Sequence, residues 1–139
     1  MTWMVSLMLP TMRFMLVQGT FKGTLVMLRL RSLTLYHEMT HIWQWNGKGQ
    51  APGGLIEGIA DYVRLKAGYA PSHWVQPGQG DRWDQGYDVT ARFLDYCNGL
   101  RDGFVAELNK KMRDGYNDGF FVDLLGKTVD QLWAEYKAT

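Results

Sequence analysis

The chain has 139 residues, of which 46% are hydrophobic and 21% are charged, and its formal net charge is +1. This length and composition predict one globular domain with its own core and exclude an intrinsically disordered chain. The near-zero charge gives no large basic field for nucleic acid or an anionic membrane surface, and no run of about twenty apolar residues predicts a transmembrane span.

The cysteine content and the N-terminal residues narrow the kinds of covalent link, metal site and targeting signal that we expect in the chain. Cys97 is the only cysteine, so the sequence excludes an intrachain disulfide and a cysteine-based zinc site. The apolar start, residues 1–18, lacks the basic region that opens a signal peptide, and Pro10 and Arg13 interrupt it. We therefore expect no cleaved signal peptide in the chain as written.

The N-terminal part of the chain gives the weakest structural pattern. Residues 1–33 hold six of the eight methionines and form an atypical segment, in which 20–30 is either a strand or the lead-in to a helix. A first helix is predicted over 31–43. The glycine-rich stretch 45–54 then predicts a loop that reverses the chain, and a second helix follows over 55–66.

Beyond residue 66 the sequence predicts helices joined by loops, so the chain is mostly helical after residue 30. A capping-box pattern at Thr128 and Gln131 starts the last of these helices. Apolar residues at helical spacing, and the glycines and prolines between them, place the other elements: a loop over 69–82 and helices over 83–98, 104–112 and 120–125.

The motif H-E-x-x-H is the most informative feature of the chain. Histidine is scarce, with three in the chain, yet two of them form this motif at His37, Glu38 and His41. On a helix, residues four apart lie on one face, so both imidazoles can bind one metal ion. Glu38 lies beside them and can take a proton from a water that the metal activates. The motif predicts a metal-dependent hydrolase with Glu38 as general base.

A catalytic zinc usually has three protein ligands, so the motif requires a third. The layout with another histidine six residues on fails, because Gly47 stands there and Gln44 stands where that layout has glycine. Glu57 follows His41 by sixteen residues, on the second predicted helix, and completes a His2Glu site. Asp61, one turn later, is predicted to accept the free N–H of a ligating histidine. Two alternatives stay open. In the first, Asp61 is the ligand and Glu57 lies outside it; in the second, the helix simply exposes both acids to solvent.

The chain from Tyr36 to Lys137 resembles the plant basic secretory protein family, also described as peptidases of plants and bacteria. The resemblance rests on residues 36–47 (YHEMTHIWQWNG) and 53–64 (GGLIEGIADYVR), with further agreement at 83–87 and 90–96. It implies a zincin-like metallopeptidase of the α+β class, usually secreted and associated in plants with defence. An extracellular location is thus expected from the resemblance alone.

The resemblance also implies a longer N-terminal part, whose strands form a sheet ahead of the metal-site helix. Residues 1–33 do not match that part, so the sheet is expected to be reduced or missing and the chain to be mostly α. The zincin-like domain is assigned to 34–139. Because zincins hold the substrate backbone along a sheet edge near the metal, a second function is open: a catalytically inactive family member that keeps the metal-binding helix pair.

The reaction implied is hydrolysis of a peptide or protein substrate, with Zn²⁺ held by His37, His41 and Glu57. His2Glu ligation favours zinc, although imidazole and carboxylate also suit other divalent ions. The oxyanion formed in the reaction needs a donor beyond the metal. Tyr87, on the helix after the long loop, is the leading candidate, and His73 is the alternative. The sequence does not specify the oligomeric state.

Overall fold

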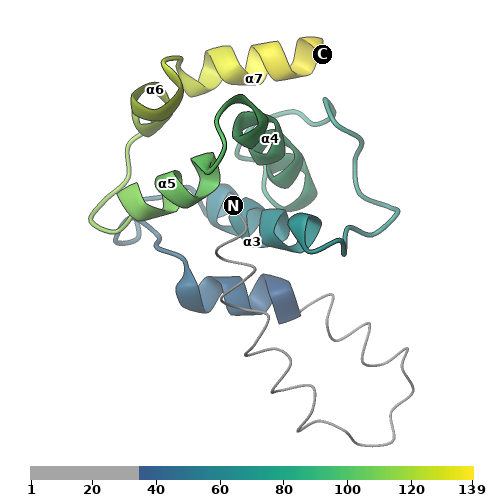
Figure 1. Cartoon of the computed structure of the whole chain (residues 1–139), viewed down its shortest axis with the longest axis horizontal. Helices are drawn as coiled ribbons and strands as arrows, with labels where there is room; N and C mark the ends of the chain where they lie inside the picture. The colour runs from purple at the N-terminus through teal and green to yellow at the C-terminus, as the bar shows by residue number, and fades with distance from the viewer. Residues whose placement is uncertain (1–34) are drawn as a thin grey trace, which may run out of the picture.

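The computed structural model describes residues 35–139, and α-helices account for its regular structure (Figure 1). The helical segments are residues 35–43, α3 (Gly53–Lys66), α4 (Tyr87–Leu100), α5 (Phe104–Lys111), α6 (Phe120–Leu125) and α7 (Val129–Ala138). No β-strand occurs within 35–139, in agreement with the mostly helical prediction. No helix of this part of the chain is long and apolar enough to cross a membrane. The atypical segment 1–33, with the strand considered at 20–30, lies outside the described residues.

The last helix begins where its sequence signal places it. The Thr128 hydroxyl accepts a hydrogen bond from the backbone N–H of Gln131 at 3.1 Å. The Gln131 side chain accepts in return from the Thr128 backbone N–H at 3.0 Å. The predicted capping box is therefore confirmed, and it satisfies two backbone donors that the first turn of α7 leaves without a helical partner.

The helix predicted from residue 83 begins instead at Tyr87, so that boundary was wrong by four residues. Gly86 has a φ of 104°, which lies outside the right-handed helical region. The Thr90 hydroxyl donates to the carbonyl of Trp83 at 2.6 Å and accepts from the backbone N–H of Gly86 at 2.8 Å. These bonds stabilise a turn over 83–86, which apolar spacing could not reveal because the Trp83 side chain is itself buried.

The main core lies between α3 and α4 and extends to α5, α6 and α7 (Figure 1). Cys97 is fully buried in it, and this burial raises the pKa of the thiol, as expected for a packing residue that is not a nucleophile. The largest fully buried side chains of the core are Tyr62, Tyr136, Phe93, Phe104, Phe121, Leu55, Ile59, Leu94, Leu108 and Met112.

Two glycines of α3 allow the chain around α4 to approach closely. A Cβ atom on Gly54 would lie 1.8 Å from the carbonyl oxygen of Asp84, and one on Gly58 would lie 2.3 Å from Cγ2 of Thr90. Gly54 and Gly58 are one helical turn apart, so both lie on the same face of α3. This pair sets the distance between α3, which carries Glu57, and the start of α4.

We expect Gly58→Ala to destabilise the fold by about 2 kcal/mol, because the new methyl group overlaps the buried Thr90 and outweighs the helix propensity gained. Gly99→Ala is the matched control, since Gly99 lies in α4 and a Cβ there meets nothing within 4 Å. That variant should be about 0.5 kcal/mol more stable than the parent. Urea unfolding measures both, and equal stabilities would contradict the close approach at Gly58.

A second apolar cluster holds residues 35–43 against α3. Tyr36 and Met39 are buried together with Val63 of α3, and Leu35, Ala67 and Tyr69 border the cluster. In Figure 1 the helical segment 35–43, in blue, lies alongside α3. The apolar contacts therefore hold the helix that carries the H-E-x-x-H motif against the helix that carries Glu57.

The turn after residue 43 is fixed from the other side by α5. The backbone N–H of Trp45 donates to Oδ1 of the buried Asn109 at 2.8 Å. The backbone N–H of Gly47 donates to the carbonyl of Met112 at 2.7 Å. Gly47 has a φ of 64°, in the left-handed region where glycine carries no steric penalty. The chain thus reverses between 43 and 53, as the glycine-rich sequence predicts.

Candidate metal centre

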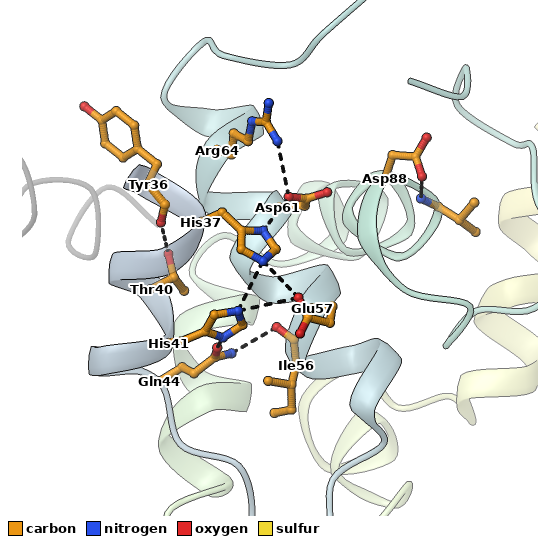
Figure 2. A network of polar contacts seen from close by, with 11 residues as sticks. Tyr36, His37, Thr40, His41, Gln44, Ile56, Glu57, Asp61, Arg64 and Asp88 are labelled. Carbon is orange, nitrogen blue, oxygen red and sulfur yellow. Dashed lines mark hydrogen bonds and ion pairs between the residues drawn. The ribbon is translucent and has the colours of Figure 1, made fainter. Parts of the chain in front are cut away.

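The helical segment 35–43 and α3 run antiparallel, and they bring His37, His41, Glu57 and Asp61 together (Figure 2). His37 Nε2 lies 2.9 Å from Glu57 Oε2. His41 Nε2 lies 3.1 Å from His37 Nε2 and 3.5 Å from Glu57 Oε2. Three atoms that can each bind a metal therefore converge on one point. Within 35–139, no other group of three His, Cys, Asp or Glu side chains does so.

The spacing of these three atoms fits a small divalent cation. Zinc binds histidine nitrogen and carboxylate oxygen at about 2.0–2.2 Å, and tetrahedral coordination then separates the ligand atoms by about 3.4 Å. The observed separations of 2.9, 3.1 and 3.5 Å lie on both sides of that value. Small side-chain adjustments therefore suffice for the three groups to surround one ion.

Asp61 and Gln44 orient the two imidazole rings. His37 Nδ1 lies 2.7 Å from Asp61 Oδ1, and His41 Nδ1 is hydrogen-bonded to Gln44 Oε1. A carboxylate or an amide oxygen only accepts hydrogen bonds, so both Nδ1 atoms carry the hydrogen. In the neutral rings, both Nε2 atoms then direct a lone pair at the shared centre, beside the carboxylate of Glu57. A cation at that point satisfies three acceptors that cannot satisfy one another.

The electrostatics of the centre also favour positive charge. The hydrogen bond to Asp61 is the main cause that raises the pKa of His37 above its ordinary value; partial burial opposes the rise, and the charges of Asp61 and Glu57 add to it. The Asp61 side chain is only 5% exposed. The Arg64 guanidinium lies 3.9 Å from the same Oδ1 atom (Figure 2), and it packs on the Trp74 ring. The raised pKa means that the carboxylates of Asp61 and Glu57 stabilise the protonated form of His37.

The centre is buried on one side and open on the other. The side chain of His37 is 12% exposed, whereas those of His41 and Glu57 are 28% and 32% exposed. Glu38 is exposed on the same helix as the two histidines. Water therefore reaches both the open side of the centre and the carboxylate of Glu38.

Tyr87 borders the centre as an exposed aromatic residue. Its ring is stacked on that of His37, with centroids 6.1 Å apart and planes 10° apart, and 55% of the residue is exposed. Tyr87 has a φ of 47°, which is uncommon for a residue with a side chain and costs on the order of 1 kcal/mol. The turn held by Thr90 and the close packing of Gly86 on Gly54 maintain this conformation. The fold thus places a strained tyrosine beside the metal-ligand candidates.

The structure places His73 apart from the centre and Gln44 beside it. His73 is exposed on the 69–82 segment and forms no hydrogen bond or ion pair with residues 35–139, so it does not join the cluster. Gln44, by contrast, contacts His41, although the sequence pattern singled it out only as a mismatch to another zinc-binding layout. Its position three residues after His41 was the available signal, since that spacing puts both side chains on one helical face.

The sequence of the chain is similar to a known family and to a known protein. A sequence profile of a family described as "Peptidase of plants and bacteria" matches residues 29–136. The chain is also 54% identical, over 57 residues, to a basic secretory protease of Boswellia serrata. That alignment covers 41% of this chain and 64% of the relative, so the chain spans less than two thirds of the relative's length. No solved structure matches the chain.

Proposed function

The chain belongs to the family of peptidases of plants and bacteria, and we therefore propose that it is a zinc-dependent peptidase with a zincin-like helix pair. The observation that supports this most is the convergence of His37 Nε2, His41 Nε2 and Glu57 Oε2 within 3.5 Å of one another. Two imidazoles and one carboxylate are a donor set that favours zinc and leaves a fourth position for water or substrate.

Zinc supplies Lewis-acid activation of water and of the substrate carbonyl when the three ligands bind it. In this proposal, residues of the chain orient the metal ligands, transfer the proton and stabilise the oxyanion. Asp61 holds the His37 ring with Nε2 directed at the centre, through the 2.7 Å contact at Nδ1. The surroundings of Asp61 are dry, and the open side of the centre, bordered by His41 and Glu57, receives the peptide bond.

Glu38 is the general base of the proposed reaction. A carboxylate oxygen of Glu38 takes the proton that the attacking water releases, and it then delivers that proton to the nitrogen of the departing amine. Glu38 is exposed, and its side chain forms no hydrogen bond or ion pair with another residue of 35–139. Glu38 lies within the helical turn between His37 and His41, so the proposed proton acceptor and the two imidazoles belong to the same helix.

Tyr87 is the proposed donor to the oxyanion that forms when water attacks the carbonyl. Its ring is stacked on that of His37 at the start of α4, and the residue is exposed, which supports this role. A preorganised donor of this kind stabilises the charge that develops in the transition state. Its strained backbone is consistent with a position selected for function.

We expect Tyr87→Phe to lower the rate of casein hydrolysis by about 10²-fold while leaving the zinc content unchanged, because the hydroxyl acts on the transition state and not on the metal. Tyr116→Phe is the control, since the Tyr116 hydroxyl donates to Asp118 on an exposed turn outside the centre. Initial rates and zinc content of the two variants measure the effect. An unchanged rate in Tyr87→Phe would remove Tyr87 from the mechanism.

The proposed substrate is a peptide or protein, and the proposed location is extracellular. The relative from Boswellia serrata is named a basic secretory protease, which supports both points. We also propose a role in plant defence, because the resemblance of the sequence to the plant basic secretory protein family implies one.

The test of the proposed function is the metal content of the purified chain, measured together with casein hydrolysis. We expect one zinc per chain and hydrolysis that a chelator abolishes and added zinc restores. Zinc without hydrolysis would support the second function considered from the sequence, a family member that keeps the metal-binding helix pair but is catalytically inactive. Folded protein that binds no zinc would overturn the proposal.

A further inference from the structure

The two histidines of the centre are held by different kinds of acceptor. Asp61, on α3, holds His37 with a carboxylate. Gln44, on the same helical stretch as the histidines, holds His41 with an amide. The backbone N–H of Gln44 donates to the carbonyl of Thr40 at 2.8 Å, so Gln44 continues the helical turn beyond residue 43. Its side chain therefore lies on the same face as His41, toward α3 (Figure 2).

The NH2 group of the Gln44 side chain determines which of its amide atoms faces His41. Gln44 Nε2 donates to the carbonyl oxygen of Ile56 at 3.1 Å. A carbonyl oxygen only accepts, so the NH2 group must point to Ile56 and the oxygen must point to His41. This orientation leaves the Nδ1–H form of His41 as the one that satisfies the contact, and it directs the Nε2 lone pair away from Gln44.

The contact at Ile56 also links the two ligand-bearing helices. Ile56 immediately precedes Glu57 in α3, so one side chain joins the histidine that ends the H-E-x-x-H motif to the backbone beside the third ligand candidate. Gln44 is only partly exposed, and both of its polar atoms have a protein partner. Gln44 thus contacts His41 and α3 without itself contributing an atom to the centre.

We propose that Gln44 is a positioning residue for His41: its oxygen fixes the Nδ1–H form of the ring, and its NH2 group holds that ring in register with Glu57. This inference rests on the proposed function for its role in metal binding, whereas its effect on the ring is independent of any metal. Removal of an outer hydrogen-bond partner of a ligating histidine typically weakens metal affinity about 10- to 100-fold.

The test compares Gln44→Leu with Gln44→Glu in the whole chain. Leucine loses both hydrogen bonds, whereas glutamate keeps an acceptor for His41 Nδ1 and loses only the donor to Ile56. Gln79→Leu is the matched control, because the Gln79 side chain accepts from Gln76 in the exposed loop before α4. Nitrogen-15 NMR of the metal-free protein, at a pH where the rings are neutral, reports the tautomer of each of the three histidines, and the exposed His73 serves as an internal reference.

We expect His41 to be in the Nδ1–H form in the parent, in Gln44→Glu and in Gln79→Leu, and to shift toward the Nε2–H form in Gln44→Leu. Zinc affinity, measured by competition with a chromophoric chelator, should fall about 10- to 100-fold in Gln44→Leu and remain at the parent value in Gln79→Leu. If Gln44→Leu does not fold, the tautomers of the parent and of Gln44→Glu decide, since an Nε2–H form of His41 in either contradicts the proposal.

An unchanged tautomer and an unchanged zinc affinity in folded Gln44→Leu would overturn the assignment of Gln44. This failure differs from a failure of the proposed function, in which the parent chain itself binds no zinc. In that case the tautomer measurement still tests whether Gln44 fixes His41, because it uses the metal-free protein.

Discussion

Glu38→Gln is expected to reduce casein hydrolysis by at least about 10²-fold and by as much as about 10⁴-fold, while the protein keeps one zinc per chain. The loss follows from the role proposed for Glu38, since an amide cannot take the proton from the attacking water or return it to the leaving amine. Zinc is retained because the three converging ligand atoms belong to His37, His41 and Glu57. Initial rates at saturating substrate, with zinc content measured on the same samples, test the expectation.

The exposure of Glu38 makes this a clean substitution, because its side chain is outside the core and glutamine has nearly the same shape. Glu107→Gln is the matched control, as Glu107 is an exposed residue of α5. That variant should keep the parent rate. Retained hydrolysis in Glu38→Gln would assign proton transfer to another group, and loss of zinc along with activity would instead make Glu38 a part of the metal site.

Glu57→Ala is expected to abolish stable zinc binding, and hydrolysis with it, whereas Asp61→Asn is expected to bind zinc about 10- to 100-fold more weakly than the parent. The difference follows from the geometry. Glu57 Oε2 lies within 3.5 Å of both Nε2 atoms, but Asp61 contacts His37 at Nδ1, on the opposite side of the ring. Removing a ligand empties one coordination position, while weakening an outer partner alters only the basicity and orientation of His37.

Zinc content after exhaustive dialysis and zinc affinity by competition measure both variants. Circular dichroism of the metal-free proteins is the control for folding, and it is needed most for Asp61, whose side chain is buried. The reverse order, with zinc lost in Asp61→Asn and kept in Glu57→Ala, would support the alternative in which Asp61 is the ligand. Equal retention in both variants would place the metal elsewhere.

The positions of most helices could be predicted from the sequence because the signals are local. The capping box at Thr128 and the apolar spacing of α5 and α6 involve residues within one or two helical turns. The start of α4 could not be predicted in this way. It depends on the φ of Gly86 and on hydrogen bonds of the Thr90 hydroxyl, and neither changes the apolar pattern that was used to place the helix.

The composition of the candidate centre could be predicted from the sequence: two histidines one turn apart, a glutamate beside them, and two acids one turn apart on a later helix. Those relations follow from the period of the helix. The packing of the helices was needed to show that Glu57 faces the Nε2 atoms and that Asp61 is buried behind His37. It was also needed to show that Gln44 and Tyr87 border the centre. The reason is that these contacts depend on the distances between helices. The packing of Gly58 against Thr90 sets the distance between α3 and α4, and the apolar cluster of Tyr36, Met39 and Val63 sets the distance between residues 35–43 and α3.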